Sequence, residues 1–73
     1  MVNEAYLLGN GFKFVKEASH PFHEYYKKGR IAVDLKEKKL FLMRYKAEQN
    51  HAELHLPDDT HKFDETVMVL LNN

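Results

Sequence analysis

The 73-residue sequence has no cysteine, no tryptophan, one serine, two prolines and three glycines. Without cysteine, neither disulfide bonds nor thiolate metal sites can form, and such a chain is typical of a reducing compartment. No apolar run approaches the roughly 20 residues that a membrane-spanning helix needs. The first residues also lack the basic start and apolar stretch of a signal peptide. These absences predict a cytoplasmic protein that does not interact with membranes.

Catalytic motifs are equally scarce. Ser19 stands beside His20, but no orienting carboxylate or oxyanion donor accompanies the pair in sequence. The run Gly9-Asn10-Gly11 is not followed by the Lys-Ser or Lys-Thr of a phosphate-binding loop. We therefore predict that the protein is not an enzyme and uses no cofactor.

Five histidines raise the question of a metal site, because imidazole is the commonest protein metal ligand. His51 and His55 would share one helix face, but in a strand four residues span roughly 13 Å, too far for one ion. We predict that no metal is bound. The alternative is a histidine metal-binding protein in which His20 or His23 joins His51 and a nearby glutamate.

The hydrophobic pattern predicts one α+β domain over residues 1–73, with 44% hydrophobic residues available for its core. We expect an antiparallel sheet of three to four strands between two helices. Asn3 can cap a short first helix that ends before Gly9-Asn10-Gly11, and Asp58, Asp59 or Thr60 can cap the C-terminal helix. The expected strands cover residues 12–16, 25–35, 40–46 and 52–56.

The strand that begins at Leu40 is apolar on both faces. If Leu35 pairs with Leu40, one face of this hairpin packs on the C-terminal helix. The other face is then either covered by the N-terminal helix or available to a partner. Tyrosine, phenylalanine, methionine and arginine are enriched at protein interfaces. The predicted partner-binding residues are Tyr26, Arg30, Phe41, Met43 and Tyr45.

The net charge of zero is unevenly distributed. Residues 1–26 carry −1, residues 27–46 carry +6 and residues 47–73 carry −5. A basic middle beside an acidic end favours self-association, since no net charge keeps the molecules apart. We therefore expect a weak homodimer with the hairpin in or beside the interface.

The basic middle also supports an alternative function. Aromatic side chains interleaved with cations suit base stacking beside phosphate neutralisation, so the chain could be a nucleic-acid-binding accessory protein. An acidic C-terminal third would repel phosphate unless it lies on the far side of the fold. The candidate nucleic-acid contacts are Tyr25, Lys27, Lys28, Arg30, Lys38 and Lys39.

The opening run from Tyr6 to Phe12, followed by Tyr26-Lys27-Lys28-Gly29 before a short hairpin, resembles small uncharacterised proteins encoded by phages and prophages of Gram-positive bacteria. The resemblance covers about two-thirds of the chain and carries no catalytic residues. It implies a protein that acts by binding a host or viral protein. We therefore predict a non-enzymatic, phage-like protein-binding accessory module that contacts its partner through the hairpin 25–46.

Overall fold

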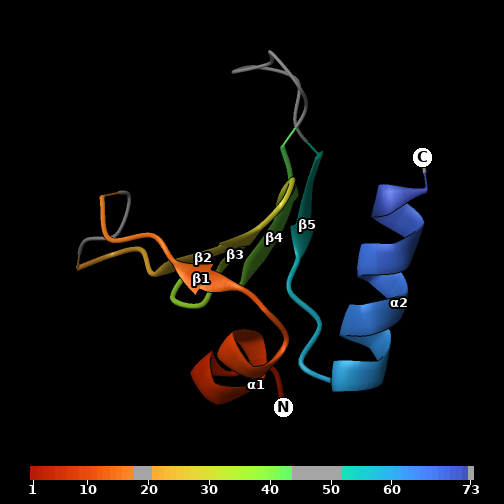
Figure 1. The fold of residues 1–73 in the computed structure, drawn as a ribbon, viewed down its shortest axis with the longest axis horizontal. Helices are drawn as coiled ribbons and strands as arrows, with labels where there is room; N and C mark the ends of the chain where they lie inside the picture. Colours follow the sequence, from red (N-terminus) through yellow and green to blue (C-terminus); the bar gives the residue numbers. More distant parts are fainter. Residues whose placement is uncertain (18–20, 44–51, 73) are drawn as a thin grey trace.

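A five-stranded antiparallel sheet with a helix at each end of the chain makes up the fold (Figure 1). The computed structural model describes residues 1–17, 21–43 and 52–72. Its elements are α1 (Glu4–Gly9), β1 (Lys13–Phe14), β2 (Tyr25–Lys28), β3 (Ile31–Asp34), β4 (Lys39–Leu42), β5 (Ala52–His55) and α2 (Thr60–Leu71). The strands lie in chain order across the sheet. The α+β class is confirmed, with five strands in place of the expected three to four.

The additional strand arises because residues 25–35 form two strands, not one. Lys28 pairs with Ile31, so Gly29 and Arg30 are a two-residue hairpin loop. Gly29 has φ +58°, at the first loop position, where a type II′ turn places glycine. The prediction of one strand over residues 25–35 was therefore wrong.

Because of this turn, the side chains of β2 lie on the opposite faces of the sheet from those predicted for one continuous strand over residues 25–35. A two-residue loop pairs Tyr26 with Val33, so these two side chains share a face. Tyr26 was expected on the same face as Phe41, as a partner-binding residue, and that placement is wrong. The expected pairing of Leu35 with Leu40 is also wrong, because Leu40 pairs with Val33.

One face of the sheet forms the core. Strand pairing aligns Phe14, Tyr26, Val33, Leu40 and Leu54 in one row. Both helices pack against this covered face, α1 with Leu7 and α2 with Phe63 and Leu70 (Figure 1). The buried core residues are Val2, Leu7, Phe12, Tyr26, Ile31, Val33, Leu40, Leu42, Leu56, Phe63 and Leu70. Within the described residues, no helix is both long and apolar enough to cross a bilayer.

The helix ends follow the capping residues in the sequence. The Asn3 side chain accepts a hydrogen bond from the Tyr6 amide at 2.9 Å and caps α1. Asp59, one of the three expected caps, accepts from the Lys62 amide at 3.0 Å and caps α2. Each cap gives one otherwise unpaired amide a partner, so both helices begin where the sequence indicates.

The buried Tyr26 joins α1 to the sheet. Its ring is fully buried, and its hydroxyl lies 2.5 Å from a Glu24 carboxylate oxygen and 3.1 Å from one of Glu4. Burial and these two carboxylates raise the pKa of the Tyr26 phenol far above its ordinary value. The hydroxyl therefore stays protonated and donates to the carboxylates that hold it.

Gly29→Ala should destabilise the fold by about 1 kcal/mol, because a side chain disfavours the left-handed conformation even where space is open. Gly9→Ala is the matched control. Gly9 ends α1 with no atom near its missing Cβ, so alanine there should be neutral or stabilise by up to about 1 kcal/mol. Urea unfolding of the three proteins measures both effects. Equal stabilities for the two variants would contradict the turn assignment.

Candidate binding face

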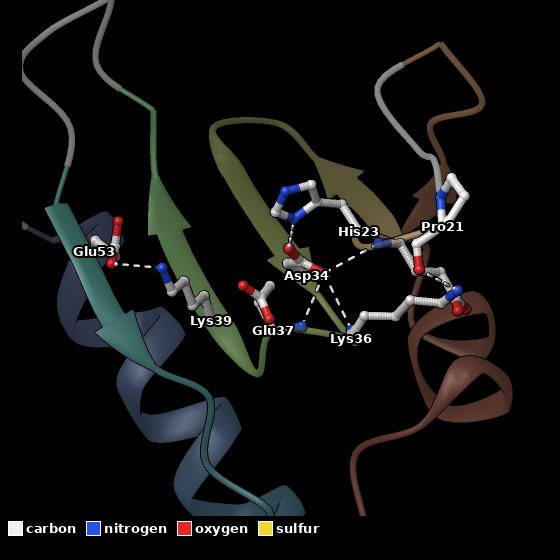
Figure 2. Close-up of polar contacts among 8 residues, drawn as sticks. Pro21, His23, Asp34, Lys36, Glu37, Lys39 and Glu53 are labelled. Carbon is white, nitrogen blue, oxygen red and sulfur yellow. Dashed lines mark hydrogen bonds and ion pairs between the residues drawn. The ribbon is translucent and has the colours of Figure 1, made fainter.

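The face of the sheet opposite α1 and α2 is called here the open face, because no described helix covers it. Figure 2 views this face with the side chains of Asp34 and Lys39 in front of the strands and α2 behind. Alternation along the strands puts two rows of residues on this face. One row contains Lys13, Lys27, Ala32, Phe41 and Glu53, and the other contains Tyr25, Asp34, Lys39 and His55.

Aromatic rings cross the centre of the open face. The His23 ring stacks on Tyr25, with centroids 5.4 Å apart and an angle of 13° between the planes. Tyr25 in turn lies 6.3 Å from the Phe41 ring on β4. Tyr25 and Phe41 are half-buried, and Met43, just after β4, is 39% exposed. These rings are anchored on strands, so they form a rigid apolar strip.

Cations flank the strip on the β1 side. Lys13 and Lys27 are exposed and directly opposite each other in the β1–β2 ladder. Like charges at opposed positions destabilise a strand pair. On the other side, the Lys39 ammonium lies 3.2 Å from a Glu53 carboxylate oxygen, and this ion pair neutralises both charges (Figure 2). The unbalanced positive charge therefore lies beside Tyr25.

The carboxylate of Asp34, which is fully buried, organises one end of the open face. Its Oδ1 atom accepts from the amides of Glu24, Lys36 and Glu37 at 3.0, 3.0 and 3.2 Å. Its Oδ2 atom lies 2.6 Å from His23 Nδ1, which donates because a carboxylate only accepts (Figure 2). One carboxylate thus joins the segment before β2 to the β3–β4 turn.

These contacts decide the ionisation of Asp34. Burial alone would raise its pKa, but the hydrogen bonds from the Glu24 amide, the His23 ring and the two turn amides together hold the pKa below its ordinary value. A histidine oriented by a carboxylate is also part of a hydrolytic triad. The one serine of the chain, Ser19, lies outside the described residues. What the structure describes of this pair is that Asp34 holds the His23 ring, which stacks on Tyr25.

The expected partner-binding residues do not all share one surface. Phe41 and Met43 lie on or beside the open face. Arg30 adjoins Met43, whose amide donates to the Arg30 carbonyl at 2.7 Å, and it also lines a groove of about 500 Å³ beside α2. Tyr26 is buried on the covered face. Tyr45 lies outside the described residues.

The candidate nucleic-acid contacts are likewise divided. Tyr25, Lys27 and Lys39 are on the open face. Lys28 belongs to the covered side, where its ammonium donates to the Asn10 carbonyl at 2.8 Å. Lys38 occupies the β3–β4 turn with φ 58°. The hairpin is therefore not a single basic surface.

No group of three metal-ligating side chains occurs among the described residues. His20 and His51, two members of the alternative metal site, lie outside them. The third, His23, is held by Asp34.

Sequence reasoning did not identify Asp34, His23, Lys13 or Glu53 as members of one surface. A usable signal existed at Asp34, because an aspartate at a strand end followed by a polar turn favours side-chain bonds to the next backbone amides. The contact with the Glu24 amide has no such signal, since it depends on the β2–β3 pairing.

No protein-family model matches the chain, and no curated protein or solved structure is significantly similar to it. A function must therefore be argued from the geometry.

Removing the Asp34 carboxylate should destabilise the protein strongly. Asp34→Ala leaves three amides and the His23 ring without their acceptor, and we expect a loss of about 3 kcal/mol in the free energy of unfolding. Asp34→Asn keeps an acceptor oxygen for the amides and should lose about 1 kcal/mol. Chemical denaturation measures both, and a stability of Asp34→Ala equal to the wild type contradicts the assigned role.

The same carboxylate should make stability depend on pH. A group with a lowered folded pKa stabilises fully above its unfolded value of about 3.9, and this contribution is lost as pH falls through the folded pKa. Stability of the wild type should therefore decrease more steeply below about pH 4 than that of Asp34→Asn. Identical acid dependence of the two proteins in thermal melts would show that Asp34 does not contribute.

Proposed function

We propose that this domain is a non-enzymatic accessory module that binds an acidic segment of a protein partner on its open face. The observation that carries the proposal is the pair Lys13 and Lys27, directly opposite each other beside the Tyr25–Phe41 strip. Such a pair weakens the sheet by itself. A partner carboxylate placed between the two ammonium groups would relieve this repulsion.

The apolar strip supports the same function. Aromatic side chains, methionine and arginine are the residue types enriched where proteins meet, and the open face offers Tyr25, Phe41 and Met43 with Arg30 adjoining. Strand anchoring limits the entropy that these side chains lose on binding. The strip would supply affinity, and the lysines would select the charge of the partner.

Charge on the two sides of the domain is opposite in sign. Apart from Glu53 on β5 and Glu48, which lies outside the described residues, the acidic residues of the C-terminal third belong to α2 and its approach, which pack on the covered face. They are Asp58, Asp59, Asp64 and Glu65. This separation would steer an acidic partner to the open face and away from α2. The resemblance to phage-encoded proteins suggests a host or viral protein as that partner.

A second candidate function is single-stranded nucleic-acid binding. One specific observation favours it, namely that α2 with its acidic residues lies on the far side of the sheet from Tyr25 and Lys27. Sheet-borne aromatics flanked by cations can stack bases and neutralise phosphates. A protein partner ranks first, because Glu53 and His55 occupy the β5 end of the same face, and only two lysines there lack a described acidic neighbour.

Charge reversal on the open face tests the first proposal. The double variant Lys13→Glu/Lys27→Glu should reduce the amount of partner captured from a lysate of the source organism by at least about tenfold, since attraction becomes repulsion. Lys62→Glu is the matched control, because Lys62 is an exposed lysine of α2. Quantitative mass spectrometry compares each captured protein across the three baits. Capture that is equal for the double variant and the wild type contradicts the proposal.

A titration with a fluorescent single-stranded oligonucleotide separates the second candidate from the first. If the open face binds nucleic acid, the dissociation constant should rise steeply between about 50 and 200 mM salt, and the double variant should not bind. Absence of binding at the lower salt concentration eliminates this function without affecting the first.

A further inference from the structure

Strand β5 is the last strand of the sheet, and the phase of its pairing shows which backbone groups point outward. The Leu56 amide donates to the Lys38 carbonyl at 2.8 Å, so this pair is a hydrogen-bonded one. In an antiparallel ladder such pairs alternate, which makes Leu40–Leu54 hydrogen-bonded as well. The amide and carbonyl groups of Glu53 and His55 therefore point away from β4, and no described strand pairs with them.

A second copy of the chain can pair antiparallel with this edge in few registers. The outward groups of Glu53 and His55 must meet outward groups of the other copy. Pairing His55 with itself places Glu53 opposite Pro57, which has no amide proton. Pairing Glu53 with itself sets two carboxylates opposite each other. The register centred on Leu54 avoids both problems.

In the Leu54-centred register, Glu53 of each copy lies opposite His55 of the other. Each of these two hydrogen-bonded pairs exchanges two backbone bonds, giving four in total. The carboxylate also faces an imidazole, which can donate a hydrogen bond or form an ion pair. The side-chain pattern of β5 is thus complementary to itself.

The apolar side chains at this edge fit the same arrangement. Leu54 projects to the covered face, yet it is 40% exposed because the sheet ends beside it. In the proposed register the two Leu54 side chains are a closely spaced pair.

We propose that the protein forms a homodimer by pairing the β5 edges of two copies, with Leu54 at the two-fold axis. The two five-stranded sheets then form one continuous ten-stranded sheet. The two-fold axis is perpendicular to the sheet, so both open faces lie on one side and both pairs of helices on the other. The dimer interface is separate from the lysine pair at the β1–β2 end, and the inference does not depend on the proposed partner.

Charge reversal and charge exchange at β5 test this inference by sedimentation equilibrium, over a concentration series reaching about 1 mM. Glu53→Lys replaces the acceptor carboxylate opposite the His55 imidazole with an ammonium group, which can only donate, and His55→Glu sets two carboxylates opposite each other. Each single variant should weaken dimerisation by about tenfold. The double variant Glu53→Lys/His55→Glu places opposite charges across the interface and should recover dimerisation to at least the wild-type level.

Two further variants distinguish this interface from others. Glu53→Pro removes an outward amide without removing a β4–β5 bond, so it should give a folded monomer by sedimentation and circular dichroism. Lys27→Glu, on the open face, should dimerise like the wild type. A wild type that stays monomeric throughout the series, or a charge exchange that fails to rescue dimerisation, overturns the inference. Dissociation by Lys27→Glu but not by Glu53→Lys would place the interface on the hairpin and also overturn it.

Discussion

The rest of the fold depends on the buried carboxylate of Asp34, which connects the segment before β2 to the turn between β3 and β4. It bonds an amide before β2 and two amides of the β3–β4 turn, while its other oxygen holds His23. Four donors on one buried carboxylate keep it ionised where burial alone would favour the protonated acid. The carboxylate thereby fixes the ends of three neighbouring strands.

Two different surfaces result from the same strands. Alternation sends Tyr26, Val33 and Leu40 to the helices and their sequence neighbours Tyr25, Ala32 and Phe41 to the open face. The covered face is apolar and supplies the stability of a small domain. The open face instead combines a half-buried aromatic strip with lysines whose mutual repulsion reduces stability. Such a loss of folding stability is expected where a surface serves binding.

The sequence predicts much of the covered face but less of the open one. The alternation through Ile31, Val33, Leu40 and Leu42 correctly indicates a shared buried face, and Asn3 and Asp59 correctly indicate helix starts. The Gly29-Arg30 turn was missed because Tyr25–Lys28 has no apolar–polar alternation that would mark it as a separate strand, and that error moved Tyr26 to the wrong face. The grouping of Lys13 with Lys27 depends on strand pairing, which local pattern does not specify.

We expect the open face, and not the acidic helical side, to recognise an acidic segment. An NMR titration with a short glutamate-rich peptide at low salt tests it most directly, with side-chain signals as reporters. The rings of Tyr25 and Phe41 and the side-chain signals of Lys13 and Lys27 should shift together, whereas the core signals of Phe63 should not. Shifts confined to α2, or no shifts at any peptide concentration, would show that the open face does not recognise acidic segments.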